Sequence, residues 1–191
     1  MADKALNVLS ICGSLRKGSY NRIVMNHLQG LASEGMRITE APSFAEFPLY
    51  NADIQNSSGF PAAVQTMAEA IRSADGVIFV SPEYNYSIPG GLKNAIDWVS
   101  RLPNQPFAGK PIAIISATGG ILGGGRMQYD LRRCMIFLDA FTMTKPEVFI
   151  GSVSQRIDEK TGQIKDEQAV GFIKQQLAAF AKFIVQHGGK S

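Results

Sequence analysis

Residues 11–21 read ICGSLRKGSYN, and they join an apolar, β-branched run at residues 6–11 to a helical pattern that begins at Asn21. Glycines let a chain turn tightly, while the free N–H groups and the dipole of a helix start attract an anion. Ser14, Ser19 and Asn21 add neutral hydrogen-bond donors, and Arg16 adds a fork of cationic ones. The stretch therefore predicts a phosphate site at a strand-to-helix junction.

The same stretch excludes two common nucleotide motifs. No Gly-Lys-Ser/Thr closes it, as a Walker A loop requires, and the dinucleotide fingerprint Gly-x-Gly-x-x-Gly is absent. A short loop rich in hydroxyl groups suits one terminal monophosphate better than a pyrophosphate. The alternative is a plain strand-to-helix turn in which Ser19 only caps the helix.

Length and charge limit the class of protein. A chain of 191 residues is long enough to bury a core, and we expect residues 1–191 to form a single domain. The first residues lead directly into a strand pattern and no apolar run could cross a bilayer, so we expect a cytoplasmic location.

The net charge of +3 comes from scattered cations, which argues against nucleic acid as a partner. Cys12 and Cys134 make no metal or redox motif, and we expect two buried thiols and no metal site.

Strand and helix patterns alternate five times along the chain. We expect strands at residues 5–12, 36–41, 76–80, 111–116 and within 142–150, and helices at 21–33, 61–73, 90–101, 126–140 and 166–187. Gly35 is expected to end the first helix, and residues 158–162 to form a turn. This alternation predicts an α/β fold in three layers, with helices on both faces of a parallel sheet. The run at 76–80 is apolar nearly throughout, which is typical of a central strand.

Three unusual loops follow strands in this scheme. They are the opening stretch, SPEYNYSIPGG at residues 81–91, and ATGGILGGG at residues 117–125. Because the carboxyl ends of parallel strands share one edge of a sheet, where ligands bind, we expect the three loops to build one site. A polar loop with embedded aromatic residues, 42–61, is expected to pack beside it.

Two motifs carry a resemblance to a known family. GSLRxGSxN at residues 13–21 and PEYNxSxPGxLKNAIDW at residues 82–98 resemble the NAD(P)H-dependent FMN reductase family, and within it the bacterial chromate and quinone reductases. The resemblance implies a flavodoxin-like fold, with five parallel strands in the order 2-1-3-4-5. It also implies an enzyme with FMN as cofactor, which oxidises NADH or NADPH and passes electrons to quinones, flavins or chromate. Homodimers or homotetramers are expected, and the alternative function is a flavodoxin-type electron carrier.

The resemblance also suggests which residues bind the cofactor. Hydride transfer through FMN needs no acid or base from the protein, so no catalytic side chain is assigned. Tyr84 and Tyr86 could contact the flavin or only pack within their loop, and the Glu83 side chain suits a nearby arginine better than an anionic cofactor. The residues expected around the FMN phosphate are Ser14, Arg16, Ser19, Tyr20 and Asn21; those expected around its ring are Pro82, Glu83, Tyr84, Asn85, Tyr86, Ser116, Thr118 and Gly119.

Two arginines and two aromatic residues complete the expectations. Arg126 follows the glycine-rich loop and is expected to attract anionic substrates, while Arg101 could reach a site only across a subunit interface. The alternative is that both are structural, with Arg126 paired to Glu83 across that interface. Trp98 and Phe137 lie off the core-facing stripes of their helices, so we expect them at subunit contacts, unless loop 42–61 covers them.

Overall fold

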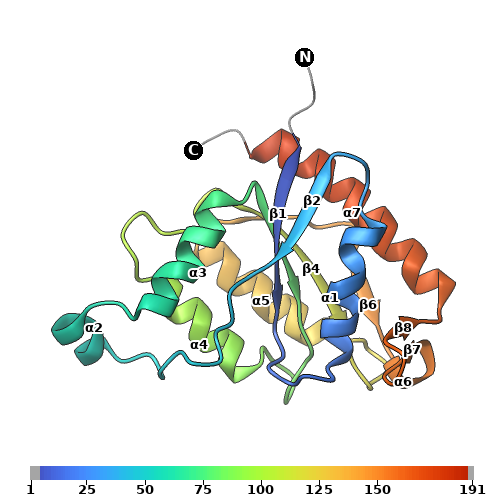
Figure 1. The fold of residues 1–191 in the computed structure, drawn as a ribbon, viewed down its shortest axis with the longest axis horizontal. Coiled ribbons are helices and arrows are strands. Elements are labelled where there is room, and N and C mark those ends of the chain that lie inside the picture. The colour runs from blue at the N-terminus through green and yellow to red at the C-terminus, as the bar shows by residue number, and fades with distance from the viewer. Residues whose placement is uncertain (1–4, 189–191) are drawn as a thin grey trace.

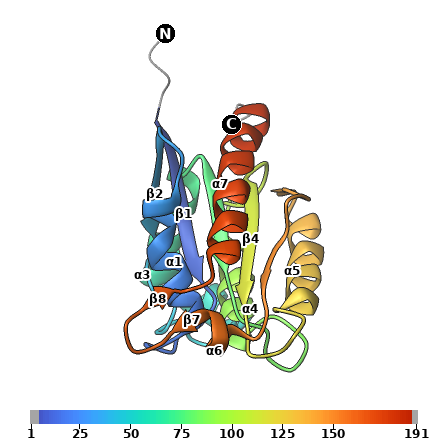
Figure 2. The same cartoon turned by 90° about the vertical axis from the view of Figure 1, so that its right-hand side faces the viewer.

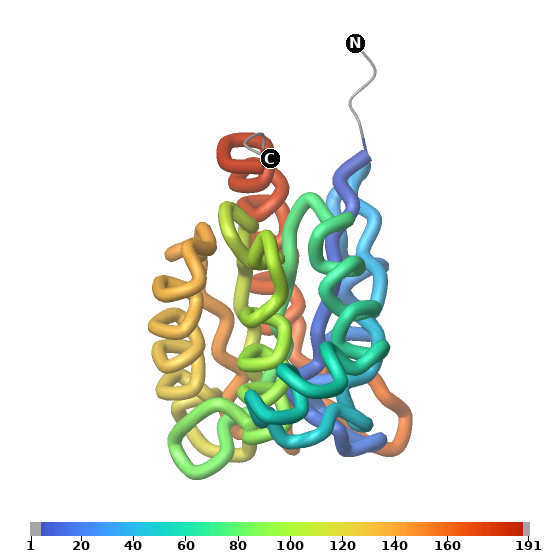
Figure 3. The backbone as a smooth tube through the Cα atoms, turned by 90° about the vertical axis from the view of Figure 1, so that its left-hand side faces the viewer, coloured from blue at the N-terminus to red at the C-terminus, as the bar shows by residue number. Residues whose placement is uncertain are grey.

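The computed structural model describes residues 5–188, which form three layers. The helices α1 (Tyr20–Leu31) and α7 (Glu167–His187) cover one face of a central sheet (Figure 2). The opposite face is covered by α3 (Ala62–Ser73), α4 (Gly90–Val99) and α5 (Gly125–Phe137), which stand side by side in Figure 3. The expected three-layer α/β fold is confirmed.

The sheet is parallel, and its strand order is the expected one. The order is β2 (Met36–Glu40), β1 (Leu6–Cys12), β3 (Gly76–Val80), β4 (Pro111–Ala117) and β5 (Phe141–Thr142). The fifth strand, which was expected within residues 142–150 with an interruption at Pro146, consists of two pieces, because β6 (Val148–Ile150) also pairs with β4, farther along it. Pro146 lies between the two pieces and has no N–H for a sheet hydrogen bond. The Gln176 amide donates to Ile114 O (3.1 Å) and Pro146 O (2.8 Å) and so bridges the gap.

Apolar residues alternate between the two faces of the sheet. In β3, Val77 and Phe79 belong to the core under α3, α4 and α5, while Ile78 and Val80 belong to the core under α1 and α7. All five residues of β3 are buried, as expected of a central strand. Within residues 5–188, no helix combines the length and apolarity that crossing a membrane requires.

Several element boundaries differ from the sequence-based expectations. Most helices begin or end within three residues of the predicted positions, but Gly35 does not cap α1. Ala32 is the C-cap, and Gly35 turns the chain toward β2 with a φ of 81° while its carbonyl accepts a hydrogen bond from Leu6 N (2.8 Å). Four short elements were not predicted at all: α2 (Ala52–Ser58), α6 (Val153–Arg156), and the hairpin strands β7 (Ile157–Asp158) and β8 (Gln163–Ile164).

Residues 42–61 pack against α4 and bury Trp98. The Trp98 indole is completely buried and donates to Pro48 O at 2.8 Å. Tyr50 and Phe60 meet the indole edge-on, with ring centroids at 5.0 and 6.3 Å. Asn94 of α4 accepts from Tyr50 N (2.8 Å) and donates to Pro48 O (2.9 Å). The prediction that Trp98 lies at a subunit contact is therefore wrong, and the covering loop is the reason.

Candidate functional site

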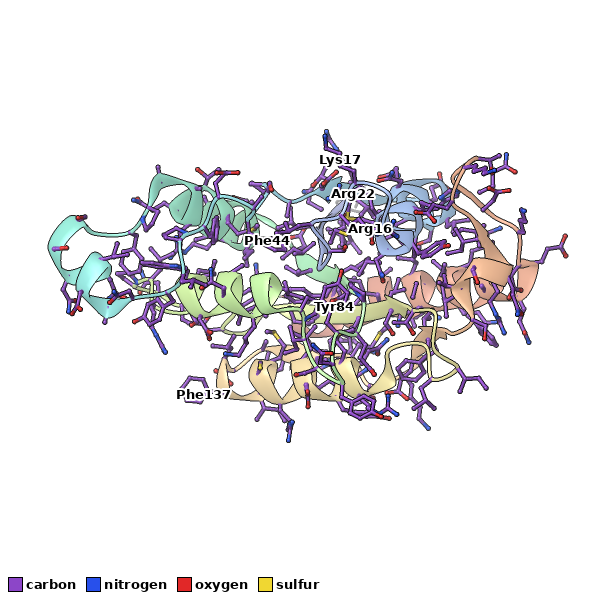
Figure 4. The ribbon with its side chains drawn as sticks, turned by 90° about the horizontal axis from the view of Figure 1, so that it is seen from below. Arg16, Lys17, Arg22, Phe44, Tyr84 and Phe137 are labelled. Atoms are coloured by element: carbon purple, nitrogen blue, oxygen red, sulfur yellow. The ribbon has the colours of Figure 1, made fainter. Side chains whose placement is uncertain are left out.

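The three unusual loops meet at one edge of the sheet, as expected. Figure 4 views this edge directly and shows Arg16 and Tyr84 near its centre, on facing loops. The Tyr84 hydroxyl lies 3.4 Å from Ser14 Oγ, although the two residues are 70 positions apart. The first and second loops therefore form adjoining walls of one site.

The first loop, residues 13–19, is a cradle of backbone donors. Among the described residues, none accepts a hydrogen bond from the N–H groups of Ser14, Leu15, Lys17 or Gly18. Gly13 lets this cradle sit against the end of β3, because a Cβ there would lie 2.1 Å from Ser81 Oγ. Free N–H groups ahead of a helix start are the features that bind phosphate.

Two serines line the cradle. Ser14 is 1 % exposed, and its Oγ accepts from Arg16 N at 3.3 Å, which folds the loop back on itself. Ser19 caps α1, because its Oγ accepts from Asn21 N at 3.2 Å. Accepting a hydrogen bond leaves each hydroxyl free to donate its own proton. Capping of the helix by Ser19 and donation to an anion are thus compatible rather than alternatives.

The Asn21 side chain joins the first loop to β4. Its side chain is buried and forms two hydrogen bonds with one residue of β4: Nδ2 donates to Ala117 O (2.8 Å), and Ala117 N donates to Oδ1 (3.0 Å). Each of the two polar groups of the amide therefore has a partner in β4. The Asn21 side chain thus ties the first loop to the start of the glycine-rich loop, and its expected contact with phosphate stays a prediction.

The second loop makes a tight turn at its tip. Tyr84 and Ser87 exchange both backbone hydrogen bonds (3.1 and 3.0 Å), and Asn85 and Tyr86 between them have positive φ angles of 49° and 68°. This geometry leaves the side chains of Tyr84, Asn85 and Tyr86 exposed at the rim. Ser87 donates to Asp130 of α5 (2.6 Å), and this hydrogen bond lowers the pKa of Asp130.

The base of the second loop is fastened to α5. Pro82 is buried, and its carbonyl accepts from Ser81 Oγ at 3.0 Å. Glu83 accepts from Arg126 Nη1 (2.8 Å) and from Met127 N (3.2 Å), so its carboxylate caps α5, which has no cap of its own at Gly124. The Glu83 side chain thus pairs with an arginine, as expected, but the pair forms within one chain.

Hydrogen bonds of the buried Ser116 side chain hold the third loop in place. Ser116 is completely buried; its Oγ donates to Gly123 O (2.6 Å) and accepts from Gln128 Nε2 (2.8 Å). The expectation that Ser116 borders the ring stays a prediction, and the structure shows that its hydroxyl supports the third loop. Thr118 and Gly119 do reach the rim, and no described residue accepts from the N–H groups of Gly119 or Gly120. These two N–H groups are available to a ligand.

The two arginines lie in different places. The Arg126 guanidinium lies 3.8 Å from the centroid of the Tyr86 ring and so stays at the rim of the site. Arg101 follows α4 at the end away from the site, where its guanidinium lies 5.3 Å from the centroid of Tyr50. Within its own chain, Arg101 is therefore not part of the site.

Two polar residues near the site were not predicted. Gln128 falls three and seven residues before Leu131 and Met135 on the buried stripe of α5, so a polar residue on an apolar stripe was a usable signal. Glu159 contacts Arg16 with an Nη1–Oε1 distance of 2.6 Å. The two residues are 143 positions apart, and nothing local in the sequence indicates this contact.

Tyr20 faces Glu159 rather than the cradle. Partial burial and a hydrogen bond to Glu159 raise the pKa of the Tyr20 hydroxyl. The ring of Tyr20 lies under Arg16, at 5.7 Å from the guanidinium to the ring centroid. Tyr20 therefore supports Arg16 from the first turn of α1.

The fold and the site together define a flavodoxin-like protein with an anion cradle at the carboxyl edge of its sheet. The sequence pattern of one family, the NADPH-dependent FMN reductases, matches residues 6–155. The chain belongs to this family.

Close relatives span nearly the whole chain. A quinone reductase of Escherichia coli (strain K12) is 50% identical over 184 residues, covering 96% of this chain and 97% of the relative. An NAD(P)H-dependent FMN reductase of Pseudomonas aeruginosa is 47% identical, covering 94% and 95%. Among solved structures, the flavoenzyme NAD(P)H:(acceptor) oxidoreductase FerB from Paracoccus denitrificans superposes with a TM-score of 0.84 at 32% identity, covering 95% and 98%.

FMN is the cofactor of this family, and the residues of the site fit it. The phosphate of FMN needs hydrogen-bond donors, and the first loop offers four free N–H groups, two buried serine hydroxyls and Arg16, which in this structure is paired with Glu159. The polar edge of a flavin ring needs further donors, and Gly119 and Gly120 offer theirs across the site. The turn at Tyr84, whose side chains are exposed, lies beside the first loop, since the Tyr84 hydroxyl is 3.4 Å from Ser14 Oγ.

Proposed function

We propose that this protein is an FMN-containing oxidoreductase that takes hydride from NADH or NADPH and delivers electrons to quinones. The observation that supports this most is the set of free donors in two loops on either side of an exposed aromatic turn. Bound FMN supplies the hydride chemistry, and the protein contributes position and electrostatics. Quinone reductases among the relatives support the acceptor class.

The residues of the three loops have separate tasks in this proposal. Ser14, Ser19 and the N–H groups of the first loop hold the phosphate, with Arg16 adding a charge-assisted bond. Tyr84, Asn85 and the backbone at Pro82 border the ring and leave one face open for the nicotinamide. The free N–H groups of Gly119 and Gly120 would stabilise the negative charge that develops on the reduced flavin ring.

We expect ping-pong kinetics, because one open ring face has to receive donor and acceptor in turn. Initial rates measured at several fixed quinone concentrations should give parallel double-reciprocal lines against NADPH, and likewise against NADH. Lines that intersect would show that donor and acceptor bind together, which contradicts a single shared face. Rapid mixing with NADPH alone should bleach the flavin absorbance, whereas the flavin of a simple electron carrier would stay oxidised.

We infer that chromate is a further acceptor and that Arg126 attracts it. Because the Arg126 side chain is 43% exposed and already pairs with Glu83, its effect on an anion is that of a surface charge. Arg126→Ala should therefore raise the KM for chromate by about twofold to fivefold and leave the KM for a neutral quinone nearly unchanged. Arg133→Ala is the matched control, since Arg133 lies on the same helix and is exposed. Equal losses for chromate and quinone would make Arg126 a structural residue only.

We also infer a homo-oligomer that is formed through α5 and is located in the cytoplasm. Ile136 and Phe137 at the end of α5 are 75% and 81% exposed, and a pair of large apolar side chains in water supports a contact between copies. Cys12 and Cys134 are both free thiols, which supports a reducing compartment.

A further inference from the structure

The hairpin formed by β7 and β8 lies against the phosphate loop. Figures 1 and 2 both show it beside the first turn of α1. At its tip, Glu159 Oε1 lies 2.6 Å from Arg16 Nη1. The same oxygen lies 3.1 Å from the point that a Cβ on Gly18 would occupy, so the carboxylate rests on the loop backbone as well. A negative charge therefore sits next to the cradle that is assigned to phosphate.

The hairpin holds Glu159 in a defined position. Asp158, the residue before it, accepts from the N–H groups of Lys160 (2.9 Å) and Thr161 (3.2 Å) and pairs with Lys165 (2.8 Å). These bonds lower the pKa of Asp158 to about 2, with the Lys165 bond as the first cause. Ile157 is buried against the core under α1 and α7. The tip is thus a short turn that hydrogen bonds and an ion pair hold in place, and the strand before it packs against the core.

We propose that Glu159 competes with the FMN phosphate for Arg16, and that it thereby sets the affinity and the exchange rate of the cofactor. This rests on the assignment of the FMN phosphate to residues 13–19 under Proposed function. Glu159 is a positioning residue here, because it acts on the cofactor through Arg16.

The charges explain why competition is expected rather than assistance. The hydrogen bond from Arg16 is the main cause that lowers the pKa of Glu159, so the carboxylate is ionised at neutral pH. The negative charge of Glu159 repels a phosphate bound to the cradle, and the pairing of Arg16 with Glu159 makes Arg16 less available to that phosphate. The side chains of Arg16 and Glu159 are 53% and 43% exposed, so water screens the attraction between them. A phosphate can therefore displace Glu159 from Arg16 or share Arg16 with it.

The test is the binding of FMN to the apoprotein of Glu159→Gln. The dissociation constant of FMN, measured from the change in flavin fluorescence, should fall by about twofold to fivefold. Stopped-flow mixing should show that most of the gain is in the association rate, because rim charges act mainly on encounter. Riboflavin, which has no phosphate, should bind the variant and the wild type equally.

Three further proteins separate competition from other effects. Glu34→Gln makes the same change in net charge at the opposite edge of the sheet, before β2, and should leave FMN binding unchanged. Glu159→Asp keeps the charge and should restore binding toward the wild-type value. In an Arg16→Ala background, Glu159→Gln should gain less than it does in the wild type, because the contested group is gone.

Two outcomes would overturn the proposal. One is an unchanged or weaker affinity of Glu159→Gln for FMN, and the other is an equal shift for FMN and riboflavin. Failure of the proposed function would look different, because FMN binding would still respond to Glu159 while the loaded protein failed to oxidise NADPH.

Discussion

Replacing Arg16 with alanine is expected to weaken FMN binding by about tenfold to a hundredfold. Arg16 is the cationic donor of a cradle whose other groups are neutral N–H and hydroxyl donors. A hydrogen bond to a charged group contributes roughly 1.5–3 kcal/mol, and this range corresponds to the expected loss. The measurement is the dissociation constant of FMN for the apoprotein, in buffer of fixed ionic strength.

Two controls show whether the loss of affinity comes from the contact between Arg16 and the phosphate. Riboflavin lacks the phosphate, so its affinity should be nearly indifferent to Arg16→Ala. Arg37→Ala removes the same charge from an exposed position on β2, and FMN binding should not change. An unchanged dissociation constant in Arg16→Ala would contradict the assignment of the phosphate to this loop.

Replacing Trp98 with alanine is expected to lower the free energy of unfolding by about 3–5 kcal/mol. The indole is completely buried beneath residues 42–61, where it meets the rings of Tyr50 and Phe60 edge-on. Alanine would leave a cavity and would also remove the donor to Pro48 O. Denaturant unfolding of the apoprotein, followed by circular dichroism, measures the difference.

Phe137→Ala is the matched control for Trp98→Ala. Both residues are large and aromatic and lie near the ends of neighbouring helices, but Phe137 is 81% exposed. Its removal should change the free energy of unfolding by no more than about 0.5 kcal/mol in the monomer. A loss of less than about 1 kcal/mol in Trp98→Ala would show that loop 42–61 does not seal the core. Light scattering of both variants separates loss of fold from loss of oligomer.

The sheet could be predicted because its signal is local and repeated. The bounds of β3 agree with the prediction to the residue, since a glycine followed by four consecutive apolar residues is typical of a central strand. The helix α2 was missed because none of its residues is buried, so it has no apolar stripe to reveal it. The hairpin of β7 and β8 was missed because each strand has only two residues.

The meeting of the three loops could be predicted from the sequence, whereas the hydrogen-bond partners of their side chains could not. Three loops at one edge follow from strand direction alone, which the sequence pattern contains. The roles of Asn21 and Ser116 depend on partners that only the folded chain supplies. Asn21 bonds with a residue 96 positions away, and Ser116 is held between Gly123 and Gln128. A sequence motif identifies the polar side chains in a loop, but it does not predict which of them will form hydrogen bonds with the backbone elsewhere in the fold.

The two hydrogen bonds between Asn21 and Ala117 also have a thermodynamic consequence. They cross from the first turn of α1 to the end of β4, and thus join the first loop to the third, which are proposed to bind opposite ends of FMN. Two walls that are fixed to each other are already in register before a ligand arrives. Binding then orders little main chain, and most of the interaction energy remains available as affinity instead of being lost as conformational entropy.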